Sequence, residues 1–213
     1  MELKELSLAV EKGKVKQVKE LVNQALSEGI PVEDILNNGL ISAMEIVGDN
    51  FRENKIFVPE MLVASRAMSA GLKILEPLMS QSGIEPIGKV VIGTVKGDLH
   101  DIGKNLVAMM MKGIGATVYD VGVDVADDVF VKKAEEVGAD IVCLSALLTT
   151  TMPAIGDVIN EFKNAGIRDK YYIMIGGAPV SQRFAEQVGA DAYTSNAADA
   201  ATVAKQHFES LGR

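Results

Sequence analysis

The stretch KVVIGTVKGDLHDIG, residues 89–103, sets the pattern for the second part of the chain. Its first half, Lys89–Val95, is a run of β-branched and apolar residues, which is typical of a strand buried on both faces. Its second half, Lys96–Gly103, joins glycine and polar residues with one of the two histidines of the chain. A buried strand that ends in such a loop, with a helical stretch after it, predicts the first unit of a parallel α/β sheet.

Four further strands are predicted downstream, and helical stretches of about 10–15 residues separate them. They span residues 116–121, 140–145, 171–175 and 190–194. Alternation of buried strands and helices indicates a parallel sheet with helices on both faces. We therefore predict a flavodoxin-like, Rossmann-like domain over residues 88–213, with five parallel strands in the order 2-1-3-4-5.

The first part of the chain, residues 1–83, has helical periodicity instead. A short helix over 3–11 is followed by one over 15–26 that stops at Gly29, one from Pro31 towards Asn54, and one from Pro59 past Leu78. Short connections between these segments predict a four-helix bundle, an N-terminal cap domain. The segment Gln81–Pro86 breaks the helical pattern and is predicted to be the linker.

Composition excludes several classes of protein. The chain has 213 residues, with 21 basic and 29 acidic ones, so its net charge is −8. An acidic chain without a basic run is a poor match for nucleic-acid binding. One cysteine and two histidines are too few for an internal disulfide or a zinc site built from those residues. No apolar run is long enough to cross a membrane, and the start Met1–Glu5 is not a signal peptide, so a cytoplasmic protein is expected.

In a sheet of the predicted type, ligands bind beyond the carboxyl ends of the strands. The loops expected there are 96–103, 146–152, 176–180 and 195–197. They hold mostly small and hydroxyl-bearing residues, which leaves room for something large. His100 is the single histidine among them.

His100 has two interpretations. It can be a solvated or helix-capping loop residue, or it can be a ligand whose other ring nitrogen is held by Asp98, two residues earlier. One protein ligand suffices for a metal only when a macrocycle supplies the other positions, as in haem and corrinoids. The small, hydroxyl-rich loops do not suit a haem pocket. A hydrolase is disfavoured as well, because Ser145 lacks the Gly-x-Ser-x-Gly elbow.

Three motifs at successive strand ends resemble those of cobalamin-binding domains. Asp98-Leu99-His100-Asp101-Ile102-Gly103 matches Asp-x-His-x-x-Gly, Ser145-Ala146-Leu147 matches Ser-x-Leu, and Gly176-Gly177 matches the Gly-Gly of that family. Val58–Leu62 and the helices around it resemble the bundle that precedes this domain in methyltransferases. The resemblance covers nearly the whole chain. It is greatest to the stand-alone corrinoid proteins of methanogens and acetogens, which serve methanol, methylamine, betaine and aryl methyl ether systems.

This resemblance implies a cobalamin or related corrinoid bound base-off and His-on, with His100 as the lower ligand of cobalt. Asp98 and, beyond it, the Ser145 hydroxyl are expected to tune that ligand. The residues expected to contact the cofactor are Gly97, Asp98, Leu99, His100, Asp101, Ile102, Gly103, Ser145, Leu147, Thr149, Gly176, Gly177 and Ala178.

The implied function is that of a methyl carrier without catalysis of its own. Cob(I)alamin takes the methyl group from a substrate-specific methyltransferase, and methylcob(III)alamin gives it to a second one that serves tetrahydrofolate or a thiol. A reductive activator of cobalt is an expected third partner, while nucleic acid and membrane are not expected partners. The sequence does not identify the methyl donor.

Two alternatives use the same motif. One is the cobalamin subunit of an adenosylcobalamin-dependent mutase, which the N-terminal helices disfavour. The other is a cobalamin-based sensor, which normally adds a DNA-binding domain. A phosphoreceiver domain is rejected because the third strand ends in Ser145-Ala146 rather than in Asp. A flavin carrier is rejected because Lys96-Gly97-Asp98 is a poor phosphate loop.

Some other residues have ordinary structural explanations. Cys143 lies within a strand and is expected to be inert. His207 is expected to be exposed near the C-terminus. Thr149–Thr151 are interpreted as caps of the helix that begins near Met152, apart from the cofactor contact of Thr149. Asp124, together with Asp127 and Asp128, is interpreted as part of a capped helix start.

Overall fold

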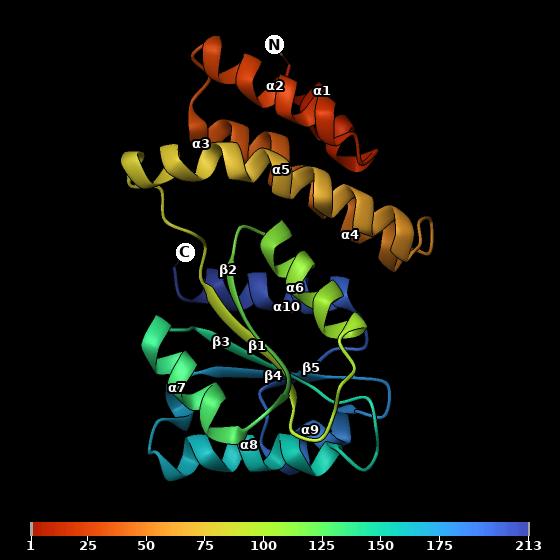
Figure 1. The fold of residues 1–213 in the computed structure, drawn as a ribbon, viewed down its shortest axis with the longest axis vertical. Helices are drawn as coiled ribbons and strands as arrows, with labels where there is room; N and C mark the ends of the chain where they lie inside the picture. Colours follow the sequence, from red (N-terminus) through yellow and green to blue (C-terminus); the bar gives the residue numbers. More distant parts are fainter. Residues whose placement is uncertain (1, 213) are drawn as a thin grey trace. The chain divides into compact units, whose positions relative to one another are not determined.

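A computed structural model describes residues 2–212, without the side chains of Ser80 and Ser82. The chain divides into two compact units. One consists of Met1–Pro86 with Gly113–Gly115, and the other of Ile87–Lys112 with Ala116–Arg213. The first unit is helical and the second holds the sheet (Figure 1).

The first unit is made of helices that each bury an apolar stripe. They are α1 (Leu3–Glu11), α2 (Val15–Ser27), α3 (Val32–Asp34), η1 (Ile35–Ile41), α4 (Ser42–Arg52) and α5 (Val58–Ser82). In α2 the buried residues Val18, Leu21, Val22 and Ala25 follow the helical period. Because α3, η1 and α4 follow one another without a break, the chain forms four helical runs here, and the predicted bundle is confirmed.

The third helical run is not the regular helix that the sequence predicts between Pro31 and Asn54. Its segment Ile35–Ile41 is π-helical. Asn37, Asn38 and Gly39 are weak helix formers. A Cβ atom at Gly39 would lie only 2.6 Å from Leu6 Cδ2, so the glycine lets α1 pack closely against this turn. Tertiary packing of this kind is not visible in the helical periodicity of the sequence.

The last helix of the unit, α5, extends further than predicted. It continues past Pro77 to Ser82, so that Gln81 and Ser82 belong to the helix rather than to a linker. Gly83 ends it with a φ of 68°, the left-handed conformation in which glycine commonly terminates helices.

The second unit is a parallel sheet of five strands in the order β2-β1-β3-β4-β5, as predicted. The strands are β1 (Lys89–Val95), β2 (Thr117–Val125), β3 (Ile141–Ser145), β4 (Tyr172–Gly176) and β5 (Ala192–Tyr193). β1 lies between β2 and β3, and it pairs with β3 in an unbroken register from Val90↔Ile141 to Thr94↔Ser145. The carboxyl ends of β1, β3 and β4 therefore lie side by side.

Helices cover both faces of this sheet (Figure 1). They are α6 (Ile102–Gly113), α7 (Asp127–Val137), α8 (Met152–Asn164), the short 3₁₀ turn η2 (Arg168–Lys170), α9 (Gln182–Val188) and α10 (Ala197–Ser210). Val91 and Val142 pack with the fully buried Phe130 of α7 and Phe162 of α8 in one hydrophobic core. Val90 to Val95 of β1 are all buried, so both faces of this strand are covered, which explains its nearly continuous apolar run.

Two strands differ from their predicted lengths by more than one residue. β5 has only two residues, whereas 190–194 was predicted. β2 continues to Val125 instead of ending at residue 121. Its register against β1 shifts twice, from Ile92↔Asp120 to Gly93↔Gly122 and then to Val95↔Val125. Each shift inserts an extra β2 residue, as in a β-bulge.

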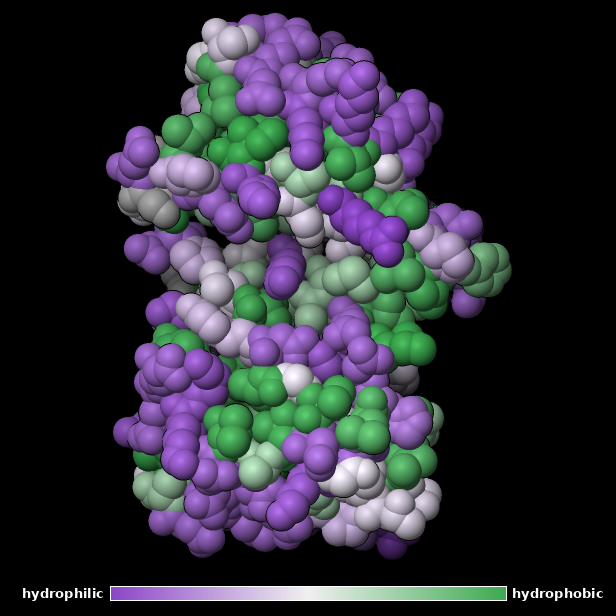
Figure 2. Space-filling view, in the orientation of Figure 1, coloured by the Kyte–Doolittle hydropathy of each residue, from purple (hydrophilic) through white to green (hydrophobic). Residues whose placement is uncertain are grey.

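Hydrophilic residues cover much of the face drawn in Figure 2, with hydrophobic residues gathered between them. Of the large hydrophobic side chains in the described part of the chain, Ile102 and Leu99 are the most exposed, at 73% and 72%. Within residues 2–212 no helix combines the length and apolar character needed to cross a membrane.

Candidate functional site

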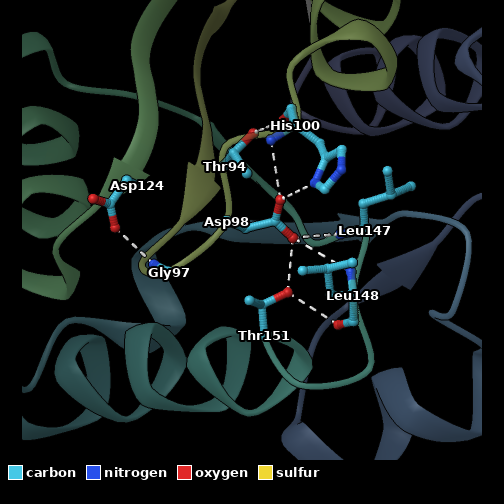
Figure 3. Close-up of polar contacts among 8 residues, drawn as sticks. All are labelled: Thr94, Gly97, Asp98, His100, Asp124, Leu147, Leu148 and Thr151. Carbon is cyan, nitrogen blue, oxygen red and sulfur yellow. Dashed lines mark hydrogen bonds and ion pairs between the residues drawn. The ribbon is translucent and has the colours of Figure 1, made fainter.

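The candidate site lies at the carboxyl edge of the sheet, where two loops meet. One loop follows β1 and carries Asp98 and His100, and the other follows β3 and carries Leu147 to Thr151. Figure 3 shows these loops facing each other, with the Asp98 carboxylate between them. The parallel pairing of β1 with β3 brings together residues that are about fifty positions apart in the sequence.

The Asp98 carboxylate is fully buried and accepts hydrogen bonds on both oxygens (Figure 3). Its Oδ2 accepts from the Leu147 amide at 2.7 Å, from the Leu148 amide at 3.4 Å and from Thr151 Oγ1 at 2.7 Å. Its Oδ1 accepts from the His100 amide at 3.1 Å and lies 2.6 Å from His100 Nδ1. A buried charge is thus surrounded by donors, as burial requires.

These contacts determine the protonation state of Asp98. Burial raises the pKa of this carboxyl, but the hydrogen bonds from Leu147, Thr151 and His100 outweigh that effect. The pKa of Asp98 is consequently well below the ordinary value of an aspartate. At neutral pH Asp98 is therefore ionised and can accept hydrogen bonds but not donate them. A neutral His100 ring must then carry its proton on Nδ1.

His100 is held so that its second ring nitrogen is available. The backbone carbonyl of His100 accepts a hydrogen bond from Thr94 Oγ1 at 2.8 Å, and Asp98 holds Nδ1. The side chain remains 49% exposed. With Nδ1 protonated, Nε2 keeps its lone pair and can bind a metal.

The hydroxyl that contacts Asp98 is that of Thr151, not that of Ser145 as the sequence analysis expected. In the described part of the chain no hydrogen bond joins Ser145 to Asp98, and Ser145 ends β3 half-buried. Thr151 also departs from its predicted role, since its side chain makes no cap for α8. The hydroxyl instead donates to Asp98 and lies 3.0 Å from the Leu148 carbonyl. Because Thr151 is one of three consecutive threonines before a helix, the sequence alone does not show which of them contacts Asp98.

The glycines of the site serve different purposes. Gly177 follows β4 with a φ of 133°, and a Cβ there would lie 1.8 Å from the Ala146 carbonyl oxygen. Gly177 is thus required by the close approach of two loops. A Cβ at Gly103, by contrast, would meet no atom within 4 Å. Gly103 leaves open space at the start of α6, next to the exposed side chains of Leu99 and Ile102.

The remaining predicted residues also lie on these loops. Gly97 precedes Asp98 with a φ of 82°. Asp101 is exposed, and its carboxylate accepts a hydrogen bond from the side-chain amide of Asn105. Leu147 and Thr149 are exposed on the loop after β3, while Gly176 and Ala178 flank Gly177. The sequence motifs therefore converge on one edge of the sheet.

Asp124 is a residue of this edge that sequence reasoning misplaced. It belongs to β2 rather than to a capped helix start, and its carboxylate accepts from the Gly97 amide at 2.7 Å. Its φ of 51° is rare outside glycine. A further difference concerns His207, which is half-buried and stacks on Tyr172 with ring centroids 4.1 Å apart.

The donor set fits a metal that needs one protein ligand. Within residues 2–212, no three or more His, Cys, Asp or Glu side chains are grouped so as to hold a metal ion. His100 has the Asp98 carboxylate behind its ring, and the exposed residues Leu99 and Ile102 are near it in the sequence. A corrinoid supplies four equatorial nitrogens and a large apolar ring, and thus matches these features.

Comparison with known proteins also points to corrinoid binding. Two models, each described as a B12 binding domain, match residues 2–76 and 88–204. The chain belongs to the B12-binding corrinoid protein family. It is 41% identical to a corrinoid protein of Desulfitobacterium hafniense over 207 residues, which is 96% of both chains.

Other members of this family are similarly close. The dimethylamine corrinoid protein 1 of Methanosarcina acetivorans is 44% identical over 205 residues and 96% of both chains. Among solved structures, the methanol:cobalamin methyltransferase complex of Methanosarcina barkeri matches with a TM-score of 0.87 and 29% identity. That match covers 96% of this chain and 78% of the other. The B12-binding fold predicted from the three motifs is confirmed.

Proposed function

We propose that this member of the B12-binding family is a corrinoid methyl carrier, with His100 as the lower ligand of cobalt. The observation that carries the proposal is the pair formed by Asp98 and His100, in which Nδ1 is engaged and Nε2 is left free. A carboxylate placed behind a metal-binding histidine fixes the ring and raises its basicity. Family membership supplies the kind of metal that such a lone ligand would hold.

The residues that would hold the cofactor follow from the loops around His100. Leu99 and Ile102 are exposed apolar side chains suited to a corrin ring. Small residues leave room for the nucleotide tail of a base-off corrinoid. We assign that tail to the space beside Gly103, Ser145, Leu147, Thr149, Gly176, Gly177 and Ala178.

A bound corrinoid would supply a cobalt atom able to accept a methyl group from one methyltransferase and to pass it to another. The protein contributes the axial nitrogen and its hydrogen-bonded support. Asp98, held by Thr151 and two backbone amides, keeps the His100 ring oriented and its Nδ1 protonated. Because the His100 side chain remains half exposed, the ring has freedom to bind or release a metal.

The partners are proposed from the relatives. Similar proteins are named for dimethylamine, and one solved relative is a complex with a methanol methyltransferase. We infer that a substrate-specific methyltransferase loads this protein. A second methyltransferase, serving tetrahydrofolate or a thiol, unloads it, and a reductive activator restores cobalt that has been oxidised.

A methyl-transfer experiment tests this function. The protein is reconstituted with hydroxocobalamin, reduced, and mixed with methyltransferases for methanol, methylamines, betaines and aryl methyl ethers from its own genome, each with deuterated donor. We expect one of these enzymes to place a deuterated methyl group on the bound corrinoid, as measured by mass spectrometry. The His100→Ala variant serves as the control for cobalt ligation. Selective retention of adenosylcobalamin, with no methyl transfer from any donor, would instead support the mutase alternative.

A further inference from the structure

The end of β2 is distorted where it runs beside the loop that carries His100. Between Ile92 and Val95 of β1, the partner strand advances from Asp120 to Val125, which is two residues more than a regular ladder allows. Bulges of this kind turn a side chain towards a new direction. Asp124 lies in the second shifted segment, with its left-handed φ of 51°.

Asp124 makes two contacts with the adjacent loop. Its Oδ1 accepts from the Gly97 amide at 2.7 Å, and its own amide donates to the Asp98 carbonyl oxygen at 2.9 Å. Figure 3 shows the Asp124 carboxylate directed at Gly97, on the side of the loop away from Leu147 and Thr151. We call these two hydrogen bonds the Asp124 clamp.

The clamp completes the support of Asp98. The loop after β3 holds the Asp98 side chain through Leu147 and Thr151, whereas β2 holds the backbone on either side of the Gly97–Asp98 peptide. Gly97 adopts a φ of 82° in the turn between the end of β1 and Asp98. The backbone around Asp98 is thus held from β2 and its side chain from the loop after β3, and His100 Nδ1 is hydrogen-bonded to the same carboxylate.

We propose that Asp124 is a positioning residue, which acts through Gly97 and Asp98 to hold the His100 ring in the orientation needed to bind cobalt. The role of cobalt rests on the proposed function, but the positioning of the Asp98–His100 pair does not. In the described part of the chain Asp124 makes no hydrogen bond to His100, and its hydrogen-bond partners are Gly97 and Asp98. Its effect is therefore distinguishable from that of a ligand.

Two substitutions separate the clamp from the backbone conformation. Asp124→Gly keeps the left-handed φ without strain but removes the acceptor for Gly97. Asp124→Asn keeps an oxygen that can accept from Gly97, and asparagine tolerates the left-handed conformation. Both variants are expected to fold, so that a difference between them reports the hydrogen bond.

The first measurement uses the protein without cofactor. We expect the Gly97 amide to exchange about five- to tenfold faster in Asp124→Gly than in wild type, because a charge-assisted hydrogen bond is lost. Nitrogen-15 shifts of the neutral His100 ring should move from the Nδ1–H tautomer towards a mixture in Asp124→Gly, and return in Asp124→Asn. His207, the other histidine, stacks on Tyr172 and provides an internal reference that should not change.

The second measurement uses hydroxocobalamin reduced to the Co(II) state in each variant. With nitrogen-15 histidine, the hyperfine splitting of the electron paramagnetic resonance spectrum reports how much cobalt is ligated by His100. We expect a smaller histidine-ligated fraction in Asp124→Gly and wild-type behaviour in Asp124→Asn.

Several results would overturn the proposal. Unchanged Gly97 exchange and an unchanged His100 tautomer in Asp124→Gly would show that the Asp124 carboxylate positions nothing. Altered exchange with a wild-type fraction of histidine-ligated cobalt would show that the clamp does not serve the ligand. If wild type itself shows no histidine nitrogen on cobalt, the proposed ligand fails, and the cofactor-free measurement still decides whether Asp124 positions the pair.

Discussion

Asp98 Oδ1 lies 2.6 Å from His100 Nδ1, while the other oxygen of the same carboxylate accepts from Thr151 and from the backbone after β3. This relationship links the exposed histidine to the interior of the sheet unit. The carboxylate is kept ionised by its donors, and it in turn defines which histidine nitrogen is free.

The Thr151 hydroxyl should matter more than the Ser145 hydroxyl. Thr151→Val keeps the shape of the side chain but removes a donor to a buried carboxylate, which should lower the free energy of unfolding by about 1–3 kcal/mol. Urea denaturation of the cofactor-free protein measures this change. Thr151→Ser should restore most of the stability, and Ser145→Ala should cost less than Thr151→Val. The reverse order would return Ser145 to the role that the sequence analysis gave it.

The stability contributed by Asp98 should depend on pH. Its folded pKa is lowered, so the folded state stays ionised at a pH where the unfolded chain takes up a proton. The contribution is therefore fully present above the unfolded value of about 4 and decreases as pH falls below it. Urea denaturation at several pH values should show the wild type losing its advantage over Asp98→Asn as the solution becomes more acidic.

A suitable control for that series is Asp128→Asn. Asp128 pairs with Lys132 at 2.6 Å on the exposed face of α7, where an ion pair contributes little. A pH-dependent difference as large for Asp128→Asn as for Asp98→Asn would contradict the account.

The two glycines of the site should respond differently to alanine. Gly177→Ala forces a Cβ against the Ala146 carbonyl and strains a φ of 133°, so the cofactor-free protein should be strongly destabilised. Gly103→Ala meets open space in a helix, so thermal unfolding should show unchanged or slightly higher stability. If the nucleotide tail passes Gly103, the same variant should bind hydroxocobalamin more weakly. Wild-type affinity in Gly103→Ala would contradict the assigned tail position.

Cys143 should be unreactive in the folded protein. The thiol lies in β3, and burial raises its pKa to about 12, so almost no thiolate is present at neutral pH. A thiol reagent should label the protein only after unfolding in urea. Rapid labelling under native conditions would show that β3 is accessible.

Much of the fold was predictable because local patterns sufficed. The apolar run Lys89–Val95 and the similar runs after it specify buried parallel strands, and the predicted order of the strands is confirmed. The bundle helices followed from their apolar spacing. The π-helical segment Ile35–Ile41 did not, because it accompanies the packing of Leu6 against Gly39.

In the candidate site, only contacts between residues close in the sequence were predictable. Asp98 and His100 are two residues apart, so their pairing could be inferred from spacing. Thr151 contacts the His100 loop from the loop after β3, and Asp124 contacts it from β2. Nothing local distinguishes Thr151 from Thr149 or Asp124 from Asp128. Their roles depend on strand register and on the bulges of β2, which are properties of the folded sheet.

The most direct test of the account is the axial ligand of cobalt in the reconstituted protein. Wild type and His100→Ala are loaded with hydroxocobalamin, and their absorption spectra and Co(II) paramagnetic resonance spectra are compared. We predict that wild type holds a stoichiometric, base-off corrinoid with a histidine nitrogen on cobalt, and that His100→Ala loses this nitrogen. Identical spectra for the two proteins, or no corrinoid retained by wild type, would contradict the central claim.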